Sequence, residues 1–340
     1  MNKESSSYQE LFLERLASRF TSRSEMVQQV AKVLHVGRDA VYRRLRGDTA
    51  LTADELMLLA EVFKLRMQIG GKQRARVPSL RYPDGRHTMH DEFDHFIHLQ
   101  LRLNEMKKLP GVSFDFASPE LPMYYEMSMP LLRSFKIFMF GITTWNLEKW
   151  KGLDFAPDLI SEPLHGIVEQ TIYDHYSLPA RELWSVGILD VTLRQLNYMV
   201  QVGRFADREH LFLIYEELQH IVDHLEAMVR AGKRFPMGTE PTADSPAFRV
   251  YHNELCSTNN VLLVKSDASA YLFTTLVTPN YVASADSYLV TEVQNWFDNL
   301  VEHGNALHFE SGKYAAQYFG YLRKQIEEHR HRNSVVQNIF

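Results

Sequence analysis

A short segment of the chain, residues 38–46, concentrates positive charge. It contains Arg38, Arg43, Arg44 and Arg46. A guanidinium group can form paired hydrogen bonds with guanine O6 and N7, or bind a backbone phosphate. These residue types are therefore suited to DNA recognition, provided that one helix presents them on one side.

The flanking residues predict helices that would hold this segment in place. Ser22 followed by Glu25, and Thr52 followed by Glu55, both match the capping box that starts a helix. Gly47 suits the position that follows a helix end. An earlier helix is predicted over residues 6–20, where Ser6 and Gln9 match a third capping box and the apolar residues recur at helical spacing (Tyr8, Phe12, Leu16, Phe20). The sequence therefore predicts four short helices within residues 1–65.

The spacing of Ala31, Val36 and Val41 resembles the helix-turn-helix of the Cro/CI-type, or lambda-repressor-like, family of transcriptional regulators. Ala31 is small enough for two helices to cross closely, and the two valines fill the angle between them. The resemblance covers residues 22–65. It implies a DNA-binding domain whose second helix, residues 38–46, enters the major groove.

Two residues depart from the family pattern. His35 stands where glycine is usual, in a turn that favours positive φ, and histidine is among the residues that tolerate this conformation. Arg44 stands where an apolar residue is usual. Leu45 can supply the missing buried contact if the helix is slightly rotated, and this leaves two registers open for the residues that face DNA.

The predicted DNA-binding residues follow from this frame. Residues spaced three to four apart share one helix face, opposite Val41 and Leu45. Asp39 would accept a hydrogen bond from cytosine N4 or orient an arginine. Two further residues, at the start of the preceding helix, would contact backbone phosphate. The complete set is Arg23, Ser24, Arg38, Asp39, Tyr42, Arg43 and Arg46.

The remainder of the chain predicts a mainly α fold in several parts. After the helix-turn-helix domain (1–65) we expect a basic linker (66–88), a helical domain (89–230), a proline-rich linker (231–247) and a small α/β or α+β unit (248–340). Within the helical domain, 121–150 reads as a core helix. Two further helices after Pro179 form an antiparallel hairpin, usable for a bundle core or for a dimer seam.

Other groupings of chemically active residues carry less information. Glu-x-x-His spacing, which occurs in di-iron helical bundles, appears at Glu92/His95, Glu162/His165 and Glu217/His220. The last pair falls beside the apolar stripe of its helix, and Pro163 weakens the helical context of the middle pair. The sequence contains no phosphate-binding loop, nucleophile elbow, zinc motif or dinucleotide fingerprint. We therefore predict neither an enzyme nor a metal or cofactor site.

Composition and charge distribution agree with this reading. The 340 residues carry a net charge of −5, but residues 1–76 hold 14 Lys and Arg against 9 Asp and Glu. Because residues 1–76 are basic and the rest of the chain is acidic, we expect residues 1–76 to be the part that binds phosphate. The single cysteine, Cys256, excludes a disulfide framework and suits a reducing compartment. The first residues do not match a signal peptide, and no apolar run is long enough to span a membrane, which predicts a cytoplasmic protein.

The sequence thus predicts a bacterial-style transcriptional regulator that binds double-stranded DNA as a homodimer through residues 89–230, with an unidentified effector. One alternative is a protein-interaction scaffold whose helix-turn-helix no longer binds DNA, because His35 and Arg44 depart from the family pattern. A weaker alternative is a metal-binding helical enzyme.

Overall fold

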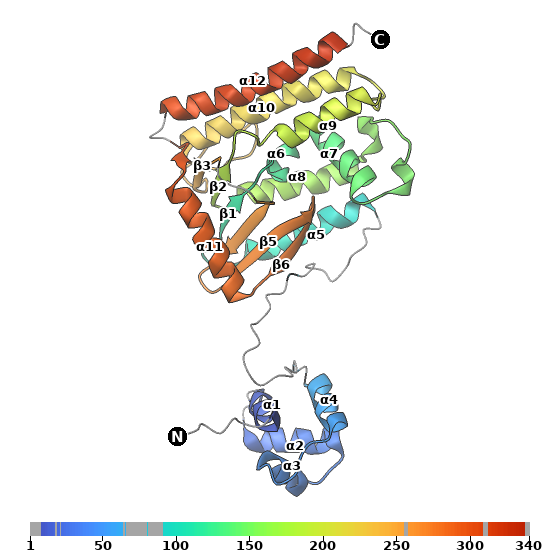
Figure 1. Ribbon diagram of the computed structural model, residues 1–340, viewed down its shortest axis with the longest axis vertical. Coiled ribbons are helices and arrows are strands. Elements are labelled where there is room, and N and C mark those ends of the chain that lie inside the picture. The colour runs from blue at the N-terminus through green and yellow to red at the C-terminus, as the bar shows by residue number, and fades with distance from the viewer. Residues whose placement is uncertain are drawn as a thin grey trace. The chain divides into compact units, whose positions relative to one another are not determined.

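The computed structural model describes residues 8–17, 19–20, 22–63, 65, 80, 91–254, 258–308 and 312–336. The chain separates into two compact units, Met1–Val77 and Pro78–Phe340 (Figure 1). The boundary falls within the predicted linker 66–88, of which only Leu80 belongs to the described residues.

The first unit, drawn in blue in Figure 1, is built from short helices around one apolar core. Residues from every helix contribute to this core (Phe12, Leu13, Leu16, Met26, Val27, Val30, Val41, Leu59, Ala60). In the described part of this unit the helices are α1 (Tyr8–Ala17), α2 (Arg23–Leu34), α3 (Arg38–Leu45) and α4 (Ala53–Val62).

The helix ends of this unit follow from local chemistry. The Ser22 side chain accepts a hydrogen bond from the Glu25 amide at 3.2 Å, which caps α2. Thr52 and Glu55 form a complete, reciprocal capping box at α4. At the end of α3, Gly47 adopts the left-handed conformation (φ 83°) that turns the chain, as a glycine after a helix commonly does.

The first helix differs from the prediction. It begins at Tyr8, and Ser6 lies outside the described residues. The Gln9 amide donates to the carbonyls of Arg44 (2.8 Å) and Thr49 (2.9 Å) and accepts from the Leu51 amide (2.7 Å). Gln9 therefore ties α1 to the connection between α3 and α4.

The second unit is organised around a mixed sheet that, among the described residues, has seven strands in the order β6-β5-β4-β1-β2-β3-β7. Strands β1, β2 and β3 are parallel, β4 to β6 form an antiparallel meander beside β1, and β7 pairs antiparallel with β3. The strands are β1 (Ser113–Ala117), β2 (Ala180–Trp184), β3 (Phe248–His252), β4 (Val261–Lys265), β5 (Ala270–Val277), β6 (Asn280–Ser284) and β7 (Asn305–Ala306).

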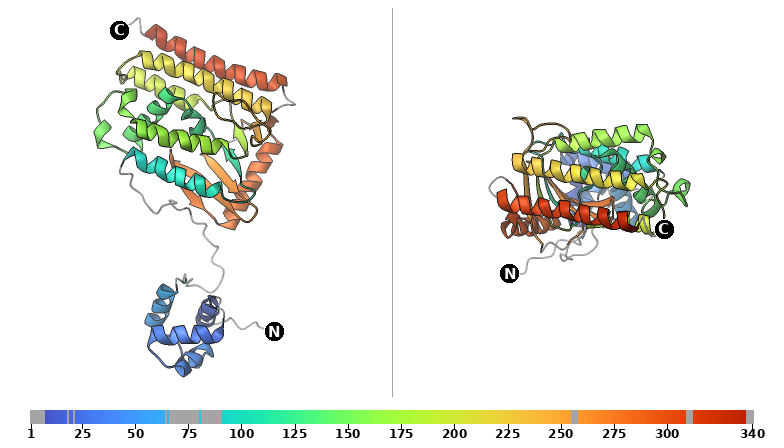
Figure 2. Two further views of the ribbon diagram at one scale, coloured as in Figure 1. Left: turned by 180° about the vertical axis from the view of Figure 1, so that it is seen from behind. Right: turned by 90° about the horizontal axis from the view of Figure 1, so that it is seen from above.

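Helices cover both faces of this sheet (Figures 1 and 2). The larger core includes Phe114 and Trp184 on one face of the sheet and buried residues of the helices that connect β1, β2 and β3. On the other face, Phe297 of α11 packs against Ala117 and Leu183. The helices of this unit are α5 (Glu92–Met106), α6 (Met123–Glu126), α7 (Pro130–Thr143), η1 (Glu148–Trp150), η2 (Pro157–Leu159), α8 (Glu162–Tyr176), α9 (Asp190–Gln201), α10 (Glu209–Ala231), α11 (Ser287–Glu302) and α12 (Gly312–Val336).

The predicted fold class, a mainly α chain with a small C-terminal α+β segment, is wrong. The second unit is an α+β fold whose central strands, β1 and β2, come from the segment expected to be a helical bundle. Strand β1 pairs directly with β4, so Phe116 lies opposite Leu262 from the far end of the chain. Residues 89–230 and 248–340 therefore share one sheet.

The segment expected to be one core helix, 121–150, is divided into α6, α7 and η1. Pro130 stands at the start of α7, where a missing amide hydrogen costs nothing. The two helices predicted after Pro179 are present as α9 and α10, and their apolar side chains, such as Leu196 and Leu218, are fully buried inside the unit. This stripe serves the intrachain core and is not free to form a dimer seam.

Candidate nucleic-acid interface

Helix α3 is the element that carries the predicted base-reading residues. Val41 is its single fully buried side chain and joins the shared core of the first unit. Hydrogen bonds from the Gly47 and Asp48 amides to the carbonyls of Arg44 and Arg43 close the end of the helix. The helix is thus fixed on one side and at its end, which leaves the opposite side to solvent.

Most of the predicted α3 residues lie on that solvent side. Arg38, Asp39, Arg43 and Arg46 are exposed, whereas Tyr42 is half-buried and packs against the core. Arg38 and Arg43 form no ion pair within the described part of the chain. Their guanidinium groups are therefore available to an external anion, and Tyr42 has a mainly structural position.

Arg46 has a partner of its own. Its Nε atom lies 2.8 Å from Asp48 Oδ2, and both side chains are more than half exposed. An exposed pair of this kind contributes at most about 1 kcal/mol. A phosphate can therefore replace Asp48 at little cost in free energy. Arg38 and Arg43 need no such exchange, because they have no ion-pair partner among the described residues.

The two residues predicted to contact phosphate begin α2. Arg23 and Ser24 are both exposed, and Arg23 forms no ion pair with any residue that the structure describes. The capping bond of this helix is made by Ser22, so the Ser24 hydroxyl is not needed for it. The first turn of a helix also presents unpaired amide hydrogens, which favour an anion.

Arg44 points away from the solvent side of α3. Its Nη2 atom lies 2.6 Å from Glu55 Oε1 and its Nε atom 3.3 Å from Glu55 Oε2, while Nη1 donates to the Ala40 carbonyl at 3.1 Å. The hydrogen bond from Arg44 is the main cause that holds the pKa of the Glu55 carboxyl below its usual value. An ion pair thus occupies the position at which the resemblance predicts an apolar contact.

His35 adopts the conformation predicted for it. Its φ of 53° and ψ of 39° are left-handed, and the Val36 amide donates to the Ala31 carbonyl at 3.1 Å across the turn. The turn geometry expected with glycine is therefore kept with histidine. Since Leu45 also packs against the core, the rotation of α3 places Arg43 outward and Arg44 inward.

The Glu-x-x-His pairs have other roles. Glu217 accepts hydrogen bonds from the amides of Leu131 (3.0 Å) and Leu132 (2.6 Å), and so caps α7. Pro163 lies in the first turn of α8, which a proline tolerates. Glu92 forms an ion pair with Lys149 at 2.5 Å. The described residues contain no group of three or more His, Cys, Asp or Glu side chains placed to hold a metal ion.

Sequence reasoning missed two residues that support this interface. Gln9 fixes the end of α3 through its bond to the Arg44 carbonyl, and Glu55 neutralises Arg44. The capping box did identify Glu55, but only as a helix-start residue. The spacing of neighbouring residues in the sequence does not predict either contact, Gln9 with Arg44 or Arg44 with Glu55.

Comparison with protein families, with characterised proteins and with solved structures finds no match to this chain. Among the helices that the structure describes, none combines the length and the apolar character needed to cross a membrane.

Proposed function

We propose that this protein is a sequence-specific, double-stranded-DNA-binding transcriptional regulator that uses α3 as its recognition helix. The observation that carries the proposal is the division of arginines on this helix. Arg38 and Arg43 are exposed and have no ion-pair partner among the described residues. Arg44 lies on the inner side of the helix and forms an ion pair with Glu55. A solvent-facing pair of free guanidinium groups on a short, firmly held helix suits entry into the major groove.

Each predicted residue has a distinct role in this proposal. Arg38 and Arg43 read guanine edges or hold phosphates, and Asp39 accepts from cytosine or orients an arginine. Arg23 and Ser24 bind the phosphate backbone at the start of α2, where the helix dipole assists. Arg46 exchanges Asp48 for a phosphate.

We further propose that the protein acts as a homodimer in the cytoplasm. A single module of this size buries too little surface for tight specific binding, so paired half-sites are expected. Contacts between copies are proposed within residues 89–230. The apolar stripe of α9 and α10 is buried inside the unit, so the contact would use an outer surface.

The scaffold alternative depended on His35 and Arg44. Both residues are accommodated locally, because His35 adopts the left-handed conformation between α2 and α3 and Arg44 pairs with Glu55. This supports the DNA-binding proposal over a degenerate module.

Selection of bound duplexes from a random-sequence pool, with the full-length chain, tests the proposal. We expect enrichment of a palindromic site with half-sites about one helical turn apart. A pool that remains random after repeated rounds would contradict sequence-specific binding. A scaffold would also lack the steep loss of affinity with salt that phosphate contacts cause.

A further inference from the structure

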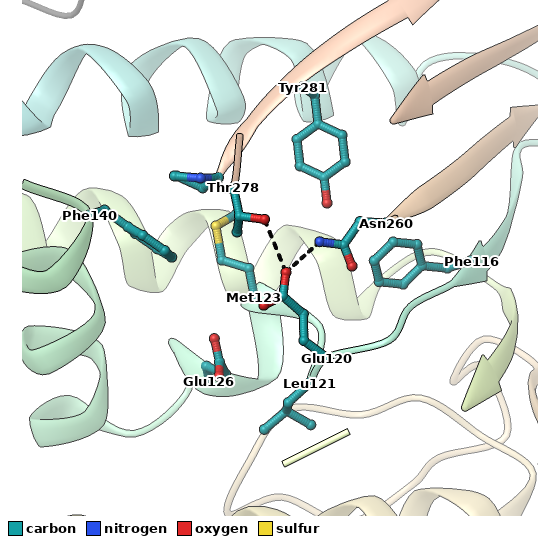
Figure 3. A pocket seen from close by; sticks show the side chains of 10 residues that line it. Phe116, Glu120, Leu121, Met123, Glu126, Phe140, Asn260, Thr278 and Tyr281 are labelled. Atoms are coloured by element: carbon teal, nitrogen blue, oxygen red, sulfur yellow. Dashed lines mark hydrogen bonds between the residues drawn. The ribbon is translucent and has the colours of Figure 1, made fainter. Parts of the chain in front are cut away.

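The cavity drawn in Figure 3, at the end of β1, is too small for an organic ligand. It is bordered by Glu120, Asn260 and Thr278, among others, and holds about one water molecule. Glu120 already accepts hydrogen bonds there from Asn260 (2.6 Å) and from Thr278 (3.2 Å). A larger partner of the second unit would therefore bind at a surface.

Helix α5 lies at the outside of the second unit and presents apolar side chains to solvent. One side of the helix packs into the core through Phe96 and Leu103, and its neighbour is α8 (Figures 1 and 2). On the opposite side, Ile97 and Leu101 are 40% and 58% exposed. These two residues are four positions apart, so they are neighbours on one helix face. Single exposed apolar residues are common, whereas adjacent ones can mark a contact surface.

Polar residues extend this face into a longer stripe, which we call the α5 stripe. It consists of Asp94, Ile97, Leu101, Asn104 and Lys108, which recur in steps of three and four residues. This is the spacing at which two helices pack side by side along a shared seam. The apolar residues stand at the centre of the stripe, with an acid at one end and a base at the other. The stripe thus has the pattern of one half of a helix pair.

The opposite charges at its two ends select the partner. Asp91 caps the start of α5 and Asp94 lies in its first turn, whereas two lysines follow its end. Lys107 pairs with Asp174 at 2.5 Å, but Lys108 is exposed and forms no ion pair with any residue that the structure describes. A second α5 in the antiparallel orientation would bring its acidic start to Lys108. A parallel one would bring like charges together, so the α5 stripe is complementary to itself only when antiparallel.

We propose that α5 pairs antiparallel with α5 of a second copy of this chain, about a twofold axis. Ile97 of each copy packs against Leu101 of the partner subunit, which gives two equivalent apolar layers. Asn104 lies beside Asp94 of the partner subunit, so that an amide can donate to a carboxylate. The inference rests on the homodimer of the proposed function, and it names the outer surface within residues 89–230 that joins the copies.

The size of this contact sets its strength. Helix α5 has 15 residues and is about 22 Å long, so the pair covers less than the roughly 1,600 Å² of a standard stable interface. Without DNA, monomer and dimer should therefore be in equilibrium at micromolar concentrations. Two half-sites on one duplex would hold two copies close together and so strengthen the pairing.

Sedimentation of the full-length chain in the absence of DNA tests the pairing. We expect the sedimentation coefficient to rise with concentration in the micromolar range. Leu101→Glu places a charge in the centre of the seam and should raise the dimer dissociation constant about tenfold or more. The control is Leu213→Glu on α10, where the leucine is 41% exposed, and it should leave the equilibrium unchanged. A monomer at hundreds of micromolar, or equal dimerisation of Leu101→Glu and wild type, would overturn the proposal.

Charge reversal tests the orientation. Lys108→Glu would face the acidic start of the partner helix and should weaken dimerisation about two- to fivefold at low salt. Lys313→Glu, an exposed lysine at the start of α12, is the control and should have little effect. Stronger dimerisation of Lys108→Glu would indicate a parallel pair, and an equal effect of both substitutions would indicate only a change in net charge. Either result contradicts the antiparallel seam.

The outcome for DNA is separate, because sedimentation is measured without it. A chain that dimerises through α5 but selects no duplex from the random pool retains this pairing and loses the proposed regulator. A chain that binds duplex DNA but stays monomeric at hundreds of micromolar loses the pairing and retains DNA binding.

Discussion

Arg44 of α3 and Glu55 of α4 form a two-point ion pair, with Nη2–Oε1 and Nε–Oε2 distances of 2.6 and 3.3 Å. Glu55 also accepts a hydrogen bond from the Thr52 amide in the capping box, so one carboxylate joins α3 to the start of α4. Because both side chains are mostly buried, the pair fixes the rotation of α3 and thereby which arginines face outward.

Removal of this ion pair should loosen the first unit. We expect Arg44→Ala to lower the free energy of unfolding by about 1–2 kcal/mol, because a mostly buried carboxylate loses its charged partner. Hydrogen exchange of the α3 and α4 amides measures this. Arg43→Ala, at the exposed neighbouring position, is the control and should change exchange little. Equal effects of the two substitutions would mean that Arg44 is not held as the structure places it.

The same pair predicts a pH dependence. The hydrogen bond from Arg44 lowers the pKa of Glu55 below its unfolded value of 4.5, so its contribution to stability is present above that pH. The contribution is lost as the pH falls through the lowered folded-state pKa. Arg44→Ala should therefore flatten the acid branch of the exchange profile of α4. An unchanged acid branch would contradict the pairing.

His35 should carry a conformational cost that glycine would relieve. Its φ of 53° lies in the left-handed region, which costs a residue with a Cβ about 1 kcal/mol relative to glycine. We expect His35→Gly to stabilise the first unit by up to about 1 kcal/mol and His35→Val to destabilise it. His35→Ala, which retains the cost, should be close to wild type. A destabilised glycine variant would show that the histidine side chain has a role that the turn does not explain.

Glu217 should matter to the second unit because it caps α7. Glu217→Ala leaves the Leu131 and Leu132 amides without their acceptors, and we expect a loss of about 1–2 kcal/mol in unfolding free energy. The adjacent Glu216, which pairs with Arg330 at the surface, is the control, and Glu216→Ala should cost less than about 0.5 kcal/mol. Urea unfolding followed by tryptophan fluorescence reports on this unit, since all four tryptophans (Trp145, Trp150, Trp184, Trp296) lie in it.

His95 should make the second unit sensitive to acid. Burial, and secondarily the nearby His98, lowers the pKa of His95 from 6.5 to about 4. Between pH 6.5 and about 4, His95 is protonated in the unfolded chain but not in the folded chain. The free energy of unfolding therefore falls as the pH drops, by roughly 3 kcal/mol over this interval. The Nε2 atom of His95 has no partner among the described residues and the ring lies against Trp145, so His95→Phe should reduce this loss. A variant with the wild-type pH profile would contradict this cause.

The first unit was largely predictable because its signals are local. Capping pairs at Ser22/Glu25 and Thr52/Glu55 fixed the helix starts, and Gly47 fixed an end. The capping box expected at Ser6 and Gln9 was less informative. The Gln9 side chain donates hydrogen bonds to the carbonyls of Arg44 and Thr49, which lie 35 and 40 positions further along the chain. Contacts of that range have no counterpart in sequence spacing.

The extent of the sheet in the second unit, and strand β2 in particular, was missed for a related reason. Strand β2 contains Arg181 and Glu182, and charged residues argue against a buried strand. In the fold, Glu182 is buried but receives hydrogen bonds from Tyr125 (2.6 Å) and Trp184 (2.9 Å), with Arg234 also nearby. Arg181 pairs with Asp115 of the neighbouring strand at 2.6 Å. The charged side chains of β2 are tolerated because residues distant in the sequence supply their hydrogen bonds and ion pairs. Local periodicity cannot identify those residues.

The central claim is that the outward arginines of α3 contact DNA. The most direct test is the affinity of the full-length chain for a duplex enriched from the random pool, measured by fluorescence anisotropy for wild type, Arg38→Ala/Arg43→Ala and the control Arg194→Ala/Arg249→Ala. The control removes equal charge from exposed positions in the second unit. The proposal predicts a loss of about 1–3 kcal/mol for each base-reading arginine and a shallower salt dependence in the α3 variant alone. Unchanged affinity in that variant, or an equal loss in both, would contradict the account.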